Sequence, residues 1–210
     1  MIERWEQHFQ REKDGWGLEP SDSALYAKNL FIKNRIKKIL IPGVGYGRNA
    51  ALFYQNGFDV TGIEISLTAI QLARENGFHF PIHLGSVVNM PFDEEVYDGI
   101  FCYALLHLLN KQERKIVLQK CYQQLAPGGL MVFTVVSVKA SMYRSGCMIS
   151  KDRYRLPNGF NVFFYSIESA QKEFQNFGLI KCCEMDEPIK FMENAEPLKC
   201  LLITCKKEDY

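Results

Sequence analysis

Short apolar runs alternate with segments of helical periodicity over most of this chain. The strand-like runs include FDVTGIEI, YDGIFCYAL and GGLMVFTVVSV, and the helical segments LTAIQLAREN and KQERKIVLQKCYQQL lie between them. Such alternation is typical of right-handed βαβ units, which build a parallel sheet with helices on both faces. The sequence therefore predicts a doubly wound α/β fold.

The carboxyl-terminal part departs from this alternation. A helical segment, IESAQKEFQNFG, is followed by two strand-like runs, LIKCCEM and KCLLITCKK, with no helical segment between them. Two strands that are joined without a crossover helix pair antiparallel. We therefore expect the sheet to finish with a reversed hairpin.

Length and composition limit the classes of function. The 210 residues, 47% of them hydrophobic, suffice for one packed domain, and 25 basic against 24 acidic residues create no overall field toward nucleic acid or membrane. No apolar stretch approaches the roughly 20 residues that span a bilayer, and the amino terminus is too charged for a signal peptide. A cytoplasmic protein without a membrane partner is expected. Seven cysteines without CxxC spacing favour reduced thiols over a metal site.

Three glycines punctuate the segment ILIPGVGYGRNA. Gly43, Gly45 and Gly47 follow an apolar run and precede a helical segment, where a backbone without Cβ atoms can bring amide groups against a ligand. Glu64 ends the next strand-like run, and its two oxygens suit the two hydroxyls of a ribose. A plain tight turn and a surface carboxylate are the alternatives. The glycine turn followed by Glu64 predicts a nucleotide-type pocket at the carboxyl ends of the strands.

Arg48 distinguishes between two cofactor classes. A dinucleotide turn reads GxGxxG, because its third glycine allows the helix to pack closely on the strand. This chain reads GxGxG and has Arg48 at that third position. The turn therefore counts against an NAD-linked oxidoreductase.

The motifs resemble those of the class I S-adenosylmethionine-dependent methyltransferases. ILIPGVGYGRNA is similar to the first motif of that family, VTGIEIS to the second, GSVVNMPF to the third, YDGIFCYALLHLL to the fourth and LAPGGLMVFTV to the fifth. The GRN after the glycines and the Trp-containing amino terminus resemble most the small tellurite-resistance and thiopurine methyltransferases. The resemblance implies a Rossmann-like seven-stranded sheet, mostly parallel with an antiparallel last strand, and S-adenosyl-L-methionine as cofactor.

The resemblance also implies roles for individual residues in holding the cofactor. The backbone of Gly43, Gly45 and Gly47 would approach its methionine part, and Glu64 would hold the ribose. Ile65 would flank the adenine, with Ser86 and Val87 at its edge. Many relatives have an acid where this chain has Ser86, whose hydroxyl can still accept from the adenine amino group.

Two aromatic residues complete the implied cofactor site. Tyr103, at the end of the fourth strand, would lie close to the transferred methyl group. Trp16 would cover the methionine end, and a Trp that merely packs a helix on the sheet is the alternative.

We expect a single methyltransferase domain, residues 1–210, that consists of four parts. Residues 1–35 form an amino-terminal helical lid, and residues 36–136 form the cofactor-binding core. Residues 137–165 are a substrate-facing insertion, and residues 166–210 are a terminal helix and the reversed hairpin.

Candidates for catalysis and substrate binding are fewer. Tyr103 lies at the end of the fourth strand, and His107 follows it with the best unperturbed pKa for a general base, unless it is a packing histidine. The insertion carries a local surplus of basic residues, from which Arg144 and Arg153 are predicted to contact a small anionic or electron-rich acceptor, unless the segment is a solvated loop.

The predicted function is transfer of a methyl group by in-line displacement to a small-molecule acceptor. An RNA or protein methyltransferase and a non-catalytic cofactor-binding module remain alternatives. A nucleic-acid partner is disfavoured because the chain has no basic stripe. The sequence determines neither the acceptor atom nor the oligomeric state.

Overall fold

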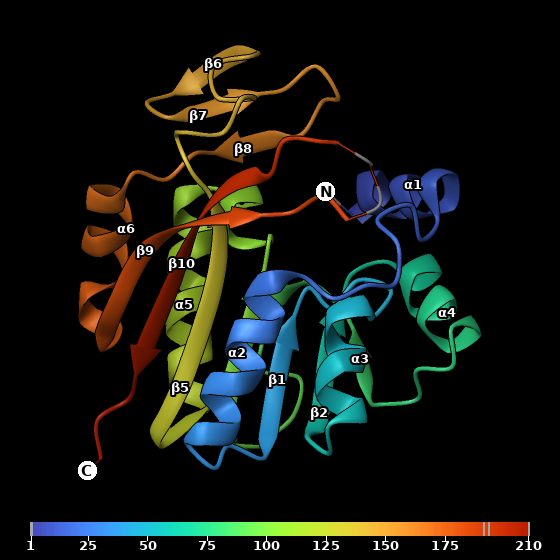
Figure 1. Ribbon diagram of the computed structural model, residues 1–210, viewed down its shortest axis with the longest axis vertical. Coiled ribbons are helices and arrows are strands. Elements are labelled where there is room, and N and C mark those ends of the chain that lie inside the picture. Colours follow the sequence, from blue (N-terminus) through green and yellow to red (C-terminus); the bar gives the residue numbers. More distant parts are fainter. Residues whose placement is uncertain (1, 191, 193, 210) are drawn as a thin grey trace.

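A seven-stranded sheet forms the centre of the computed structural model, which describes residues 2–190, 192 and 194–209 (Figure 1). The strand order is β3-β2-β1-β4-β5-β10-β9. Five strands run parallel: β1 (Lys38–Pro42), β2 (Asp59–Glu64), β3 (Ile82–Leu84), β4 (Tyr97–Tyr103) and β5 (Leu125–Val136). The doubly wound α/β fold that the alternation predicts is confirmed.

The reversed hairpin is confirmed as well. It consists of β9 (Leu179–Glu187) and β10 (Leu198–Lys206), which pair antiparallel. The last strand, β10, also pairs antiparallel with β5, so it lies inside the sheet and β9 forms the edge.

Helices cover both faces of the sheet. On one face are α2 (Asp22–Lys33) and α3 (Arg48–Gln55), and on the other are α5 (Lys111–Gln124) and α6 (Ile167–Phe174). At the β2–β3 side, α4 (Leu67–Glu75) packs beside α1 (Ile2–Glu12). Ser21 begins α2 as the sequence predicts, because its side chain accepts a hydrogen bond from the Ala24 N–H.

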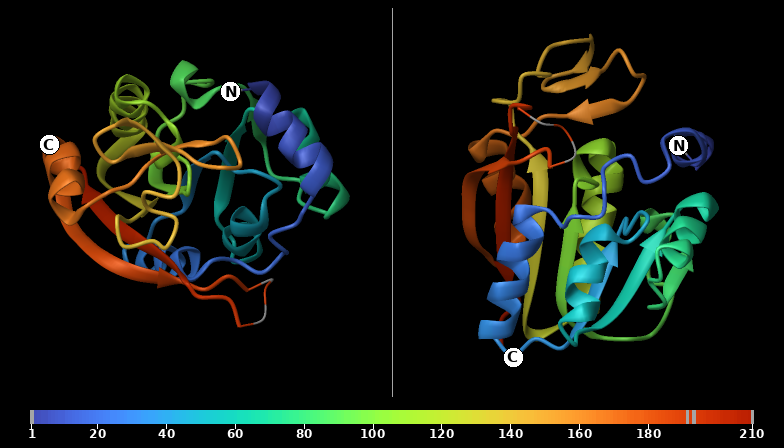
Figure 2. Two further views of the ribbon diagram at one scale, coloured as in Figure 1. Left: turned by 90° about the horizontal axis from the view of Figure 1, so that it is seen from above. Right: turned by 45° about the vertical axis from the view of Figure 1, so that its right-hand side comes forward.

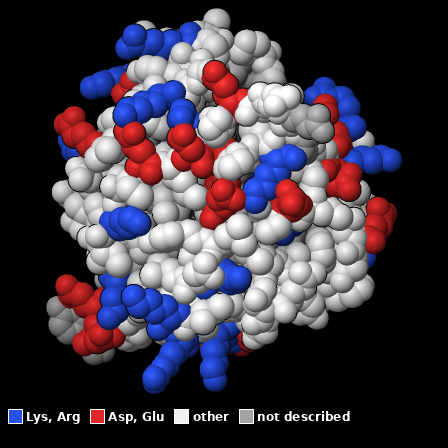
Figure 3. All heavy atoms as spheres, viewed as in Figure 1, with Lys and Arg blue, Asp and Glu red and all other residues white. Residues whose placement is uncertain are grey.

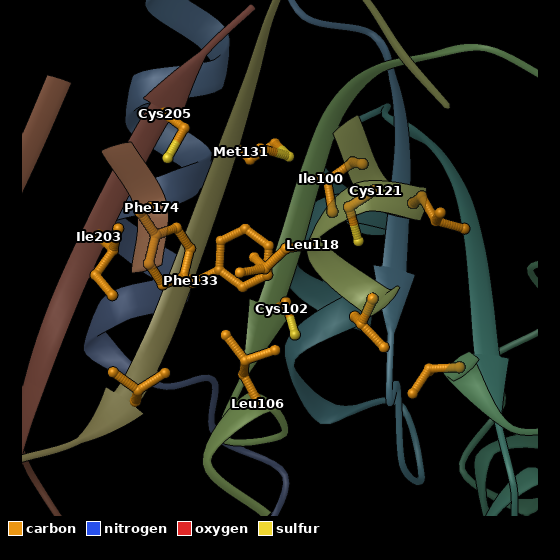
Figure 4. Packing of buried hydrophobic residues seen from close by; sticks show 14 of the residues in the cluster. Ile100, Cys102, Leu106, Leu118, Cys121, Met131, Phe133, Phe174, Ile203 and Cys205 are labelled. Atoms are coloured by element: carbon orange, nitrogen blue, oxygen red, sulfur yellow. The ribbon is translucent and has the colours of Figure 1, made fainter. Parts of the chain in front are cut away.

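The core between the sheet and α5–α6 is apolar and closely packed (Figure 4). Phe133 on β5 and Phe174 on α6 are fully buried, with ring centroids 5.2 Å apart. Burying each such ring stabilises the fold by roughly 1.5–3 kcal/mol. This packing fixes the sheet on which the strand ends are displayed.

An insertion between β5 and α6 folds as a second, smaller sheet. Its strands are β6 (Cys147–Ser150), β7 (Arg153–Arg155) and β8 (Asn161–Phe163), all antiparallel. Seen from above, this sheet and α1 both lie over the carboxyl ends of the main strands (Figure 2). Short 3-10 turns complete the element order: η1 (Val87–Asn89), η2 (Leu106–Leu108) and η3 (Gln175–Phe177). No helix in the described part of the chain has the length and apolar character needed to cross a membrane.

Candidate active site

A cavity of about 480 Å³ lies at the carboxyl ends of β1 to β5, beneath α1 and the insertion. Its volume falls within the range of small-molecule sites. The position is the one expected of an open α/β sheet, where ligands bind at the point at which strand order reverses. Here the strand order reverses at β1: β2 and β3 lie on one side of it, and β4 and β5 lie on the other.

The glycine turn forms the floor of this cavity. Gly43 has φ +70° and Gly45 has φ +58°, conformations that side chains with a Cβ atom rarely adopt. A Cβ on Gly43 would lie 3.0 Å from the side chain of Leu105. Both glycines line the cavity, so their backbone is open to a ligand.

Gly47 does not reach the cavity, although the sequence places it with the other two glycines. It is buried beneath the turn with φ +86°, and a Cβ there would lie 3.0 Å from Phe78 and 3.2 Å from Phe80. This glycine lets α3 begin close to the β3 side of the sheet. Its position supports the packing of the turn.

Glu64 is the last residue of β2. It lines the cavity and is 4% exposed. The carboxylate accepts hydrogen bonds from the N–H groups of Gly45 at 2.8 Å, Ile65 at 2.8 Å and Ser66 at 3.0 Å. Burial raises the pKa of Glu64, against these three donors, which lower it. Glu64 thus ties the glycine turn to β2 and keeps acceptor capacity for about one more donor, which fits a ribose hydroxyl.

The residues predicted to surround adenine lie together beside Glu64. Ile65 and Ser86 follow β2 and β3, and Val87 opens η1; all three line the cavity. Ser86 precedes η1 without a capping hydrogen bond from its side chain, so its hydroxyl is free for a ligand. The chain therefore offers an apolar slot with one polar group at its edge, which fits a nucleobase.

Arg48 contacts both Tyr103 and Trp16, away from the residues predicted to surround adenine. The Arg48 guanidinium lies 5.4 Å from the centroid of the Tyr103 ring and donates to the carbonyl oxygens of Trp16 and Glu19, both at 3.3 Å. Burial raises the pKa of Tyr103, so the phenol stays protonated near neutral pH and is no base.

Aromatic side chains of α1 and the segment after it cover the cavity. Trp16 stacks on Tyr46 with centroids 6.2 Å apart and on His8 at 4.9 Å. Trp5 packs on Phe160 of the insertion at 4.8 Å, so the lid and the insertion touch above the cavity. Burial lowers the pKa of His8, whose Nε2 atom is buried without a hydrogen-bond partner.

His107 lies on η2, directly after β4, and is 6% exposed at the cavity wall. Its Nδ1 atom accepts a hydrogen bond of 3.3 Å from the N–H of Val136, the last residue of β5. Burial lowers the pKa of His107 to about 4. The ring is therefore neutral near pH 7, with its single proton on Nε2.

Beyond His107 the cavity wall is apolar. We call this end the acceptor chamber; it is lined by Leu108, Val136, Met142, Leu156, Val162 and Leu198. Four parts of the chain contribute to it: η2, the end of β5, the insertion and the start of β10.

Neither arginine predicted to bind substrate lines the cavity. Arg144 is exposed and lies over the Tyr143 ring, 4.9 Å from its centroid. Arg153 turns away to donate a hydrogen bond to the Leu109 carbonyl. The placement gives no support to the substrate contacts that the basic surplus suggests.

Three residues of the site escaped the sequence analysis. In the sequence, Arg48 serves only as an argument against a dinucleotide cofactor, and Trp5 lies in the predicted lid without an assigned role. Glu187, 2% exposed at the cavity wall, accepts from the N–H groups of Asp22 at 2.6 Å and Ser23 at 3.2 Å at the start of α2. No local pattern marks Glu187, because its partners are about 165 residues away in the chain.

Comparison with known proteins agrees with this geometry. Residues 40–133 match the model of a family described as "Methyltransferase domain". A malonyl-[acyl-carrier protein] O-methyltransferase of Salmonella typhimurium is 26% identical over 107 residues, which are 51% of this chain and 42% of that protein. The chain thus matches less than half of the length of this curated relative.

Solved structures share the fold at low sequence identity. The 1,6-didemethyltoxoflavin-N1-methyltransferase of Burkholderia thailandensis, solved with 1,6-didemethyltoxoflavin and S-adenosylhomocysteine bound, has a TM-score of 0.74 and 18% identity over 99% of this chain and 88% of its own. A structure described for the conversion of a disulfide bond into a thioacetal group in echinomycin biosynthesis has a TM-score of 0.74 and 17% identity over 99% and 93%.

The narrower resemblance to tellurite-resistance and thiopurine methyltransferases stays a prediction. The wider one is confirmed by the matched family model together with the seven-stranded fold. Residues 40–133 of this chain form a methyltransferase domain of the class I S-adenosylmethionine-dependent type, with S-adenosylmethionine as its cofactor.

Proposed function

We propose that the chain transfers a methyl group from S-adenosylmethionine to a small-molecule acceptor. One observation carries the proposal: a single covered cavity joins the groups that fit the cofactor to the acceptor chamber. Glu64, Ile65 and Ser86 lie at the β2–β3 end of this cavity, and the chamber lies at the β5–β10 end. The Burkholderia relative with a small molecule bound in the same fold supports this reading.

The cofactor brings most of the chemistry. When bound, S-adenosylmethionine supplies a methyl group on a cationic sulfur, which leaves as a neutral thioether when the lone pair of an acceptor attacks the methyl carbon in line. The chain contributes alignment and exclusion of water, effects that together reach about 7–11 kcal/mol in favourable systems. Trp5 on Phe160 and the hydrogen bond from Arg4 to the Gly159 carbonyl join the lid to the insertion above the cavity.

A macromolecular acceptor fits this arrangement poorly. The lid and the insertion meet above the cavity, so a nucleic-acid strand or a folded protein would have to displace them. Acidic and basic side chains are interspersed around the upper part of the face drawn in Figure 3, where a nucleic acid would need a basic stripe. A small molecule needs neither feature.

Calorimetric titration with S-adenosylmethionine and S-adenosylhomocysteine tests the proposal. We expect micromolar binding by the wild type and at least about a tenfold loss in Glu64→Ala, because the carboxylate accepts from the ribose. Glu75→Ala, an exposed change on α4, is the matched control and should bind as the wild type does.

Glu64 also holds the glycine turn, so the thermal unfolding of the unliganded variant must be measured alongside. Radiolabelled S-adenosylmethionine with a panel of small acceptors then measures transfer. A wild type that binds neither cofactor form, or binds and transfers to no small acceptor but does transfer to RNA or protein, would overturn the proposal.

A further inference from the structure

The basic surplus of the insertion suggests a site for an anionic or electron-rich acceptor, but the acceptor chamber is apolar. Its walls are aliphatic or thioether side chains, several of them buried. In the described part of the chain, Arg48 is the one Lys or Arg at the cavity, and it lies at the cofactor end beside Tyr103. Among the described residues, no side chain of the chamber would therefore pair with an anionic acceptor, and burying a charge that no side chain pairs with is costly.

The basic residues of the insertion have other partners. Lys139 forms an ion pair with Glu184 at 2.5 Å, and Arg153 donates to the Leu109 carbonyl. Glu187 moreover adds a carboxylate to the cavity wall, where it is held by the first N–H groups of α2. A negative charge on the acceptor would be repelled by this carboxylate, and no described Lys or Arg lines the chamber itself to offset the repulsion.

His107 is the polar group at the entrance to the chamber. The Val136 N–H occupies its Nδ1 atom, so the proton of the neutral ring lies on Nε2. The ring then has no free lone pair toward the cavity and offers a donor there. In this state His107 is no general base, contrary to the role predicted from the sequence.

We propose that the acceptor chamber takes an uncharged acceptor of mostly apolar surface, and that His107 orients it by donating a hydrogen bond from Nε2. This inference rests on the proposed function. It names the class of acceptor: a flat or compact apolar molecule with one oxygen or nitrogen atom that accepts the bond. Such an acceptor loses little on leaving water and satisfies the Nε2 donor of His107.

Three probes of similar shape test the proposal by calorimetric titration of the wild-type protein saturated with S-adenosylhomocysteine. Quinoline is apolar with one accepting nitrogen, naphthalene lacks that atom, and quinoline-2-carboxylate adds a negative charge. We expect quinoline to bind about three- to tenfold more tightly than naphthalene, the usual contribution of one hydrogen bond. The carboxylate should bind at least about tenfold more weakly than quinoline.

Two variants of His107 separate its donor from its structural bond. His107→Asn keeps an oxygen near the place of Nδ1 for the Val136 N–H but has no donor at the place of Nε2, whereas His107→Gln keeps a donor near the place of Nε2. Quinoline and naphthalene should then bind equally to the Asn variant, and the preference should persist in the Gln variant. A purely structural role would leave the Asn variant like the wild type.

The outcomes distinguish this inference from the function on which it rests. If S-adenosylhomocysteine itself does not bind, the proposed function fails and the inference falls with it. If it binds and quinoline-2-carboxylate binds as tightly as quinoline, the uncharged acceptor is overturned alone. Equal binding of quinoline and naphthalene to the wild type would likewise remove the role of His107.

Discussion

At the scale of single residues, His107 makes the stability of the protein depend on pH. Burial holds its pKa at about 4 in the folded chain, against an ordinary value of about 6.5 when unfolded. The unfolded chain therefore takes up the proton first as the pH falls. The stability associated with the neutral ring is complete above about pH 6.5 and is lost as the pH falls toward 4.

The variant His107→Asn exposes this contribution, because Asn does not titrate and still accepts from the Val136 N–H. Between about pH 7.5 and about pH 5, we expect the free energy of unfolding to fall by roughly 2 kcal/mol more in the wild type than in the variant. Chemical denaturation at the two pH values measures the difference. Equal falls in both proteins would mean that His107 titrates normally in the folded state.

Residues in a local motif were predictable, and residues joined by tertiary contacts were not. Gly43, Glu64 and Ser86 lie at or just after the ends of three successive parallel strands, so the alternation of strands and helices places them at the same edge of the sheet. The direction of Arg144 and Arg153 depends on where the insertion folds back, which composition does not encode. The tautomer of His107 depends on Val136, 29 residues away.

At the scale of elements, α1 is held over the cavity by few polar contacts. Glu6 accepts hydrogen bonds from the Ser66 hydroxyl at 2.6 Å, the Thr68 N–H at 3.3 Å and the Thr68 hydroxyl. These bonds lower the pKa of Glu6, so the carboxylate is ionised near neutral pH. They fasten α1 to the first turn of α4.

We expect Glu6→Ala to loosen α1 without unfolding the sheet. Tryptic cleavage after Arg11 should become about three- to tenfold faster, because the bonds to Ser66 and Thr68 each contribute a modest stabilisation. The control is Glu3→Ala, which removes an exposed carboxylate from the same helix. If both variants are cleaved at the wild-type rate, the Glu6 contacts do not hold the lid.

The main elements could be read from the sequence because each satisfies a simple period. After Lys38, the strand β1 is a continuous buried apolar run, and α2 has a serine cap followed by helical spacing. The sheet of β6, β7 and β8 escaped prediction because its strands have three or four residues and β6 is exposed throughout. Strands so short carry no alternation that distinguishes them from a loop.

At the scale of the whole molecule, the sheet separates two tasks along its width. Glu64, Ile65 and Ser86 lie at the ends of β2 and β3, whereas the acceptor chamber depends on β5, β10 and the insertion. The two regions share only the cavity between them and His107 at its middle. The insertion can thus change with the acceptor while the cofactor end stays as it is.

Replacing the insertion tests this division directly. Ser137 pairs with Tyr165, and the Val138 N–H donates to the Tyr165 carbonyl at 3.0 Å, so a short Gly-Ser linker can replace residues 139–164. We expect S-adenosylhomocysteine to bind within about threefold of the wild type, because its polar contacts remain. Quinoline should bind at least about tenfold more weakly, because the linker removes the apolar walls that the insertion supplies.

A milder change on the outer face of the insertion is the control for this replacement. Met148→Ser alters an exposed side chain on β6, away from the chamber, and should leave both affinities unchanged. Thermal unfolding of the shortened chain shows that the sheet persists. If the shortened chain is folded and loses S-adenosylhomocysteine together with quinoline, the insertion also supports the cofactor end, and the two tasks do not divide along the sheet.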